Sequence, residues 1–319
     1  RRIMIFDSES VFEENVITVL KQHGWKDGVL RYPTERDLLD NWKGILYRNN
    51  NDIDRLGKYP LTDGEMTQII EQIETLRTPL ALNSFVNGRT VSITRDNKED
   101  VAHFGKEVSL YIYDRKEIAG GKSTYQIAQQ PVYPAKNKML NSRRGDLVLL
   151  INGMPLIHIE LKKSGIPVSQ ATNQIEKYAH EGVFTGLFRL VQIFVAMNPD
   201  DAVYFANPGV DKFNPSYYFH WADYNNEPIC GGQNPGKDEW KLFIGGTSGT
   251  AGLLSIPMAH QLIGFYTIAD SADGCLKVLR SYQYIAANAI SDVVRKCDWE
   301  QRPATPGRPG GYVWHTTGS

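Results

Sequence analysis

The residues that could carry chemistry lie in one hairpin-like stretch, GDLVLLINGMPLIHIELKKSG, at residues 145–165. Two apolar runs flank an Asn-Gly dipeptide at 152–153, which is typical of a tight β-hairpin turn. In the second run Glu160 and Lys162 alternate with apolar residues, so both side chains lie on one face of a strand. Asp146 opens the first run. These three ionisable groups interrupt an otherwise apolar hairpin and are the first candidates for a site.

The pairing register decides whether Asp146 shares a face with Glu160. A two-residue turn would place Asp146 opposite Ile159, on the other face of the sheet. A three-residue loop, or one bulge, would place it opposite Glu160, with the β-carbons about 5 Å apart. Two carboxylates that close repel each other unless a divalent cation lies between them. We therefore expect the three-residue loop, and a metal site with the Lys162 ammonium beside it.

Two carboxylates, a metal ion and a lysine suit the hydrolysis of phosphodiesters. Bound magnesium lowers the pKa of a water molecule and neutralises charge on the scissile phosphate. A lysine can orient the nucleophile or stabilise the transition state. The simpler alternative is a half-exposed strand with a solvated Glu–Lys pair, because an E-x-K pattern is common by chance.

The composition is that of a large globular protein. The chain has 319 residues, of which 41% are hydrophobic, and a formal net charge of -1. No apolar run reaches the ~18 residues of a membrane span, and the first residues make a poor signal peptide. Three widely spaced cysteines favour reduced thiols and a cytoplasmic protein. With this balanced charge, a DNA-binding surface would need positive residues gathered locally.

The elements that must position the hairpin follow a mixed pattern. Capping boxes predict three helices that begin at Ser10, Thr34 and Thr62. Strand-like runs come next, and a helix is expected after the hairpin. Helical patterning resumes near residue 257 after an irregular segment. The further strand candidates lie near 90, 108, 125, 190–197 and 202–206, and the helix spans about 167–180. This order favours a mixed α/β domain over a regular βαβ repeat.

The hairpin and the helix after it resemble a known family. Asp…Glu-x-Lys is the PD-(D/E)xK nuclease signature, and the hairpin followed by QATNQIEKY closely resembles the nuclease domain of the restriction (R) subunit of type I restriction–modification enzymes. The resemblance implies an α/β fold with a restriction-endonuclease-like core, in which helices flank a mixed central sheet. It implies catalytic roles for Asp146, Glu160 and Lys162. Magnesium, for which manganese can substitute, would be bound by Asp146, Glu160 and the Leu161 main-chain carbonyl.

Two further motifs of the family have counterparts here. Gln174 and Tyr178 match its Q-x-x-x-Y motif, and their spacing places both on one helical face, where they could brace the hairpin or approach a DNA phosphate. The segment SESVFEENVITVLKQHGW resembles the family's first helix, which makes Glu13 and Glu9 additional acidic candidates. Glu13 also has a structural explanation as a capping-box residue. Gly145 departs from the family, whose members often carry a bulkier residue there.

Basic residues surround the hairpin in the sequence. Arg143 and Arg144 precede it, Lys163 lies at its end, and Lys136 and Lys138 come shortly before. Around a nuclease site they would contact the phosphates of double-stranded DNA. Their alternative role is ordinary solubilising charge. No base-reading motif is visible, and in the family sequence recognition belongs to a separate subunit.

The end of the chain resembles the start of an ATP-driven motor. LRSYQYIAANAI matches the family's R-x-Y-Q segment, and YVWHTTGS resembles a strand and the first half of a Walker A loop, without the lysine and hydroxyl that hold phosphates. We expect an endonuclease domain at 1–255, with a linker and the truncated start of a translocase domain at 256–319, a helical stub of a RecA-like motor. The ATP-site remnants are Arg280, Tyr282, Gln283, Thr317 and Gly318.

The resemblance therefore implies a Mg²⁺-dependent DNA endonuclease domain in the cytoplasm, with no membrane association. In the intact family protein, cleavage is coupled to ATP-driven DNA translocation beside methyltransferase (M) and specificity (S) subunits, and ATP would serve only the full-length chain. The alternative is a catalytically silent nuclease-fold module that docks DNA or partner subunits.

Overall fold

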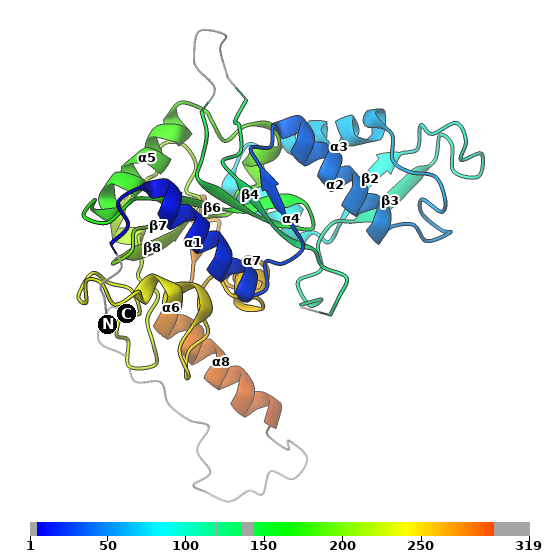
Figure 1. Ribbon diagram of the computed structural model, residues 1–319. Helices are drawn as coiled ribbons and strands as arrows, with labels where there is room; N and C mark the ends of the chain where they lie inside the picture. The colour runs from blue at the N-terminus through cyan, green and yellow to red at the C-terminus, as the bar shows by residue number, and fades with distance from the viewer. Residues whose placement is uncertain (1–4, 119, 135–142, 297–319) are drawn as a thin grey trace, which may run out of the picture.

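The computed structural model describes residues 5–118, 120–134 and 143–296. A mixed six-stranded sheet forms its centre, with the strand order β1-β4-β5-β6-β7-β8 (Figure 1). The β1–β4 and β6–β7 pairs are parallel and the other three are antiparallel. The expected mixed sheet flanked by helices is confirmed. The strands of this sheet are β1 (Val29–Arg31), β4 (Tyr125–Gln129), β5 (Leu147–Ile151), β6 (Met154–Leu161), β7 (Ile193–Met197) and β8 (Ala202–Ala206).

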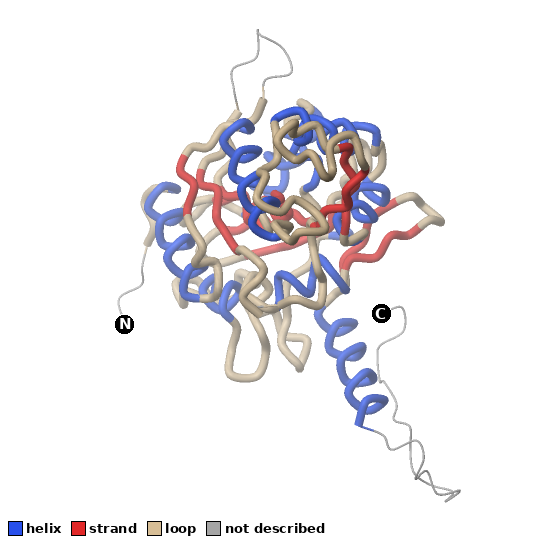
Figure 2. Tube along the Cα trace, turned by 90° about the vertical axis from the view of Figure 1, so that its right-hand side faces the viewer, coloured by secondary structure: helices blue, strands red, loops and turns tan. Residues whose placement is uncertain are grey.

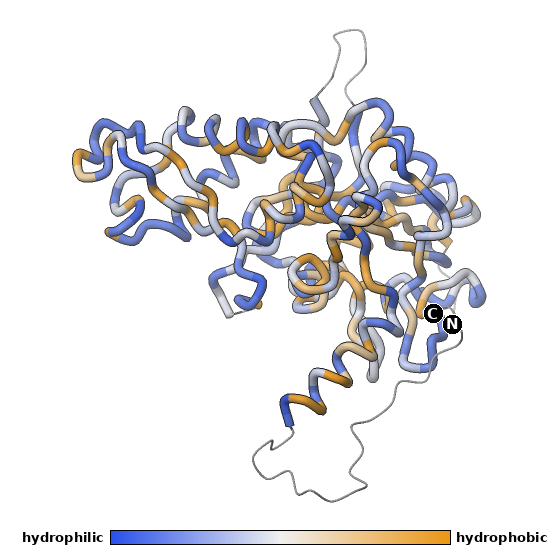
Figure 3. Tube along the Cα trace, turned by 180° about the vertical axis from the view of Figure 1, so that it is seen from behind, coloured by the Kyte–Doolittle hydropathy of each residue, from blue (hydrophilic) through white to orange (hydrophobic). Residues whose placement is uncertain are grey.

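Helices cover both faces of this sheet, which is why its central strands are buried throughout and mostly apolar. On one face α5 (Val168–His180) packs Ala171 and Ile175 against Phe194 of β7. On the other face lie α1 (Glu9–Gln22) and α6 (Glu239–Gly245), whose Phe12 and Trp240 rings are 5.2 Å apart. Figure 3 shows the apolar residues gathered in the middle of the molecule.

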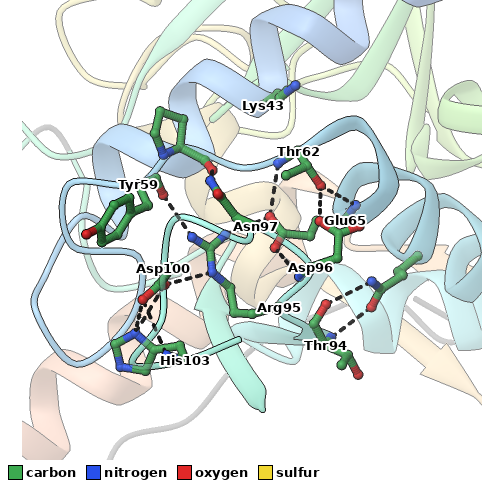
Figure 4. Close-up of polar contacts among 12 residues, drawn as sticks. Lys43, Tyr59, Thr62, Glu65, Thr94, Arg95, Asp96, Asn97, Asp100 and His103 are labelled. Atoms are coloured by element: carbon green, nitrogen blue, oxygen red, sulfur yellow. Dashed lines mark hydrogen bonds and ion pairs between the residues drawn. The ribbon is translucent and has the colours of Figure 1, made fainter. Parts of the chain in front are cut away.

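A smaller lobe extends from this core and contains β2 (Thr90–Thr94) and β3 (Glu107–Tyr111), which form a two-stranded sheet with each other. In Figure 1 it lies to the right, beside α2 (Glu35–Asn49) and α3 (Asp63–Thr75). The buried guanidinium of Arg95 joins β2 to α3 through Glu65 (Figure 4). The lobe is therefore held by ionic contacts as well as by apolar packing.

Two of the three predicted helix starts are confirmed. Thr34 and Thr62 both form capping boxes. The first was wrong: α1 begins two residues earlier, with Ser8 as its N-cap, and the Ser8 hydroxyl accepts a hydrogen bond from the Val11 amide. Glu13 is consequently not a capping residue. It lies in the second turn of α1 and is buried.

The remaining elements connect or extend the core. The segment expected to be irregular, 207–249, contains the short helix α6, which the sequence did not predict. At the other end, α8 projects away from the body (Figures 1 and 2). No described helix is long and apolar enough to cross a membrane. The remaining bounds are α4 (Pro79–Asn87), α7 (Met258–Phe265), β9 (Thr267–Asp270), β10 (Cys275–Val278), α8 (Ser281–Lys296), and the 3₁₀ turns η1 (Gly186–Leu190) and η2 (Pro215–Tyr217).

The predicted boundary near residue 255 stays a prediction. Residues on its far side contact the central sheet directly. The hydroxyl of Tyr125 lies 2.8 Å from Nδ1 of His260, and the hydroxyl of Tyr204 donates to the Leu279 carbonyl at 2.8 Å.

Candidate active site

The β5–β6 hairpin has a tight turn and a bulge. Asn152 and Gly153 both have positive φ angles, of 53° and 84°, as a two-residue hairpin turn requires. Ile151 pairs with Met154, so the expected three-residue loop was wrong. A bulge between Leu149 and Leu150 shifts the register instead.

The bulge is what brings the two carboxylates to one face. Beyond it Leu147 pairs with Ile159, so the next position along, Asp146, lies opposite Glu160. The sequence identified a bulge as the alternative way to reach this register. One extra residue in β6 therefore determines whether the hairpin has a two-carboxylate face.

The carboxylates of Asp146 and Glu160 are close enough to perturb each other. Burial, followed by repulsion from Glu160, raises the pKa of Asp146 well above its usual range. Asp146 Oδ2 accepts a hydrogen bond of 2.6 Å from the Leu161 amide, which fixes the side chain across the end of the hairpin. Burial also raises the pKa of Glu160 to about 8, although the Lys162 ammonium acts in the opposite direction.

Glu160 is fully buried and poorly matched. Neither of its carboxylate oxygens has a hydrogen-bond partner in the described part of the chain. His158 Nε2 lies 3.3 Å from Oε2 and Lys162 Nζ lies 3.6 Å from Oε1, and the Asp146 side chain is close enough to lower the pKa of Glu160 by hydrogen bonding. Buried carboxylate oxygens without donors are rare, and a bound cation satisfies them well.

The Lys162 ammonium lies at the mouth of this pair. Besides Glu160, it lies 3.7 Å from Glu9 Oε1 and donates to the Leu161 carbonyl at 3.0 Å. The side chain is almost buried, whereas that of Glu9 is half exposed. Of the two acidic candidates on α1, Glu9 thus contacts the lysine.

Glu13 contacts the other side of the site. It accepts hydrogen bonds from Gln129 at 2.5 Å and Gln130 at 3.2 Å, at the end of β4. Burial raises its pKa, and the charge of Asp146 adds to that effect. The structure thus places Glu13 near the hairpin, whereas its capping role is absent.

Gln174 and Tyr178 brace the hairpin from α5. The Gln174 amide donates to the Tyr178 hydroxyl at 2.7 Å, and that hydroxyl donates to the carbonyl of Arg144 at 2.9 Å. This chain of hydrogen bonds ends two residues before Asp146. Of the two predicted roles for the pair, bracing is the one that the geometry supports.

Two buried residues beside Glu160 were not predicted to form part of the site. The sequence placed His158 on the polar face of β6 but assigned it no role. The hydroxyl of Tyr133 lies 2.8 Å from its Nδ1. Burial lowers the pKa of His158 to about 4, so its ring is neutral. The sequence carries no spacing signal for Tyr133, which lies 25 residues before His158.

The basic residues expected to contact DNA differ in how they are held. Arg143 forms a two-pronged ion pair with Glu181, with distances of 2.9 and 3.0 Å. Lys163 donates to the carbonyl of Asp7 at 3.4 Å. Arg144 is exposed, with its guanidinium carbon 5.8 Å from the centre of the Tyr32 ring. Lys136 and Lys138 lie outside the described residues.

The predicted ATP-site remnants lie away from the hairpin. Arg280, Tyr282 and Gln283 line a cavity of about 290 Å³ between the β8 end of the sheet and the start of α8. The Gln283 side chain accepts from the Arg280 amide at 2.9 Å and so caps the helix. Thr317 and Gly318 lie outside the described residues. An ATP-related role for these positions stays a prediction.

The donor set fits one oxygen-bound divalent cation. No group of three or more His, Cys, Asp or Glu side chains in the described ranges is placed to hold a metal. A site here would therefore use two carboxylates and a main-chain carbonyl, completed by water, as magnesium commonly does. The Glu160 oxygens, which form no hydrogen bond with the described residues, could coordinate the cation.

Comparisons with known proteins place the chain in a family. Residues 7–213 match the family model for the type I restriction enzyme R protein N terminus. The chain is 29% identical to the SsaAORF53P endonuclease subunit of Staphylococcus saprophyticus over 99% of its length, and 30% identical to the SauMSSORF170P endonuclease subunit of Staphylococcus aureus over 99%. It spans about 29% of each of these relatives. The EcoprrI endonuclease subunit of Escherichia coli is 26% identical over 97% of the chain and 90% of that relative. The chain belongs to the type I restriction enzyme R protein N-terminus family.

Proposed function

We propose that this chain is the Mg²⁺-dependent DNA endonuclease domain of a type I restriction enzyme R subunit, and that it hydrolyses phosphodiesters at the β5–β6 hairpin. Asp146, Glu160 and the Leu161 carbonyl would hold the metal, for which Mn²⁺ can substitute. The main support is Glu160, which is fully buried and whose carboxylate oxygens close no hydrogen bond within the described residues, although His158 Nε2 and Lys162 Nζ lie 3.3 and 3.6 Å away. A carboxylate with only a structural role would normally be matched.

The side chains around the metal position divide the chemistry between them. When bound, the metal supplies an acidified water and offsets negative charge on the phosphate. The Lys162 ammonium lies within 4 Å of Glu160 and so faces the position at which a phosphate would meet the pair. There it can hold the attacking water or stabilise the charge of the pentacovalent transition state. Tyr178 keeps the start of β5, and with it Asp146, in place.

The acidic residues of α1 have supporting roles in this proposal. Glu9 limits the position of the Lys162 ammonium from the solvent side. Glu13, held by Gln129 and Gln130, can orient a water next to Asp146. Both act through groups that touch the substrate.

The wider activity concerns a longer protein. In that protein we propose that cleavage is coupled to ATP-driven translocation of double-stranded DNA, beside M and S subunits in the cytoplasm. The names of the relatives, endonuclease subunits of type I restriction enzymes, support this assignment. ATP would be used only by the full-length chain.

One observation favours a second candidate, a silent module that docks DNA or partner subunits. Arg143 is neutralised by Glu181, and Lys163 is bound to a main-chain carbonyl, so two of the basic residues expected to bind phosphate are engaged internally. In such a module the carboxylate pair would have no catalytic consequence.

Cleavage of supercoiled plasmid separates the two candidates. Full-length R subunit, assembled with its M and S subunits and supplied with Mg²⁺ and ATP, should cut the plasmid. Asp146→Ala and Lys162→Ala should abolish cutting and leave ATP hydrolysis intact, because the motor is elsewhere in the chain. If both variants cut like the unmodified protein, the nuclease assignment is wrong.

A further inference from the structure

We propose that His158 is a positioning residue that fixes the carboxylate of Glu160. In this proposal Tyr133 determines which nitrogen of the His158 ring carries the proton, and Gly145 leaves the space that both rings need. This inference rests on the proposed function, because Glu160 is the carboxylate that would hold the metal. His158 is not part of the Asp…Glu-x-Lys signature. It would act through Glu160 and not on the substrate.

His158 lies against one oxygen of Glu160. The imidazole is fully buried, and its Nε2 lies 3.3 Å from Glu160 Oε2. Neither atom has a hydrogen-bond partner among the described residues. The rings of Phe184 and Phe194 surround the imidazole, with centroids 5.4 and 6.0 Å away, so it has no other orientation to adopt.

The hydroxyl of Tyr133 determines which nitrogen carries the proton. Tyr133 is buried, and its hydroxyl lies 2.8 Å from His158 Nδ1, its one hydrogen-bond partner in the part of the chain that the structure describes. A buried phenol donates its proton to an available acceptor. Nδ1 is therefore the acceptor, and the neutral ring carries its proton on Nε2. That N–H faces Glu160 Oε2 at 3.3 Å and attracts the carboxylate without closing a hydrogen bond, while Oε1 lies toward Lys162.

Gly145 explains why this pair fits. A β-carbon at position 145 would lie 2.5 Å from the Tyr133 hydroxyl oxygen and 2.8 Å from Cε1 of His158. Both distances are too short, so any larger residue would displace one ring or the other. The glycine thus leaves room for two rings behind the carboxylate of Glu160.

The tautomer of His158 is a direct test that needs no metal and no variant that disturbs the fold. Nitrogen-15 NMR of the histidine-labelled chain should show a protonated Nε2 and an unprotonated Nδ1 for this ring. In Tyr133→Phe the Nδ1 acceptor loses its donor, and the Nδ1–H form should become populated. A ring with its proton on Nδ1 in the unmodified chain would overturn the proposal.

Metal affinity tests the positioning role itself. In a Mn²⁺ titration followed by calorimetry, His158→Phe should bind about tenfold or more weakly, as is usual when a residue that orients a metal ligand is lost. His158→Gln keeps an N–H near the Nε2 position and should stay within about threefold of the unmodified chain. Equal affinity of all three proteins, or equal losses in both variants, would overturn the proposal.

Two control variants separate this inference from the proposed function. Asp146→Ala and Glu160→Ala should lose Mn²⁺ binding whatever His158 does. If they do, and His158→Phe still binds like the unmodified chain, the positioning role alone is wrong. If the unmodified chain takes up no Mn²⁺, both proposals fail.

Discussion

Two buried clusters in this protein combine carboxylates with a cation, and they differ in how completely they are matched. In the lobe, Glu65 accepts from Arg95, the Thr62 amide and the Asp96 amide at 2.7–3.0 Å (Figure 4). Asp100 accepts from Arg95 at 3.1 Å. In the hairpin, neither oxygen of Glu160 forms a hydrogen bond with any residue that the structure describes.

The pKa values of one carboxylate in each cluster, Asp100 in the lobe and Glu160 in the hairpin, shift in opposite directions. Burial alone would raise the pKa of Asp100, but hydrogen bonds from His103 and Arg95 lower it below its usual range. In the hairpin, burial raises the pKa of Glu160 to about 8, because the contacts around it do not compensate. Buried carboxylates that accept hydrogen bonds stabilise the fold, whereas buried carboxylates that accept none can bind a cation.

The largest expected effect comes from breaking the matched cluster. Arg95→Ala leaves the carboxylates of Glu65 and Asp100 buried without their cation, which should cost about 3–5 kcal/mol of unfolding free energy. Chemical denaturation of the chain measures it. Arg89→Ala, which removes an exposed guanidinium from the same lobe, is the matched control. A loss below about 1 kcal/mol for Arg95→Ala, the range of an exposed pair, would contradict the comparison.

Glu160 should make the unfolding free energy fall as the pH rises, whereas a carboxylate with a lowered pKa makes it rise. Because the pKa of Glu160 is raised in the folded state, the folded protein holds a proton that the unfolded chain has released. The difference in metal-free unfolding free energy between the unmodified chain and Glu160→Gln should therefore fall between about pH 5 and pH 8, by up to about 1.4 kcal/mol per pH unit for one proton. The difference is the quantity to compare, because the lowered pKa of His158 makes stability rise over part of this range in both proteins. Denaturation in EDTA across that range tests it, and a rise in stability with pH that Glu160→Gln abolishes would contradict it.

The brace on the hairpin should make a moderate contribution. Tyr178→Phe removes the donor to the Arg144 carbonyl and the acceptor for Gln174, which should cost about 1 kcal/mol of unfolding free energy. Gln174→Ala should cost less, because its partner keeps the Arg144 contact. If Gln174→Ala proves the more damaging of the two in the same denaturation series, the hydrogen bonds do not run in the direction described.

The smallest effect concerns the two neighbouring arginines before the hairpin. Arg144 is exposed, whereas Arg143 is paired with Glu181. Arg144→Ala should weaken DNA binding and lower the salt slope of the affinity by about 1, as expected for one lost phosphate contact. Arg143→Ala should change the slope little. Fluorescence anisotropy with a DNA duplex across a salt series measures both, and the reverse ranking would show that the Arg143 pair opens on DNA.

Much of the hairpin could be predicted from the sequence, because strand alternation alone places Glu160 and Lys162 on one face. The register could not, because the extra residue of the bulge is one apolar residue among several. Asn152 and Gly153 adopt the positive φ angles of a two-residue turn. The bulge produces the one-residue register shift that the three-residue loop was expected to produce.

The contacts between distant segments were the least predictable part. Thr34 and Thr62 were identified as helix starts because capping is local. Ser8 and Ser10 can both cap a helix, so the sequence alone does not decide between them as the start of α1. With Ser8 as the N-cap, Glu13 lies in the second turn and is buried, and it has no capping role. Tyr133 meets His158 only after the sheet has formed, and no local pattern indicates it.

The central claim is that Asp146 and Glu160 form one metal site, and Mn²⁺ binding to the chain tests it most directly. Calorimetric titration near pH 8, where Glu160 begins to lose its proton, should show one class of site in the unmodified chain. The account predicts that Asp146→Ala and Glu160→Ala each lose this binding, while Glu181→Ala, a carboxylate outside the site, keeps it. Unchanged Mn²⁺ affinity in the two site variants would contradict it.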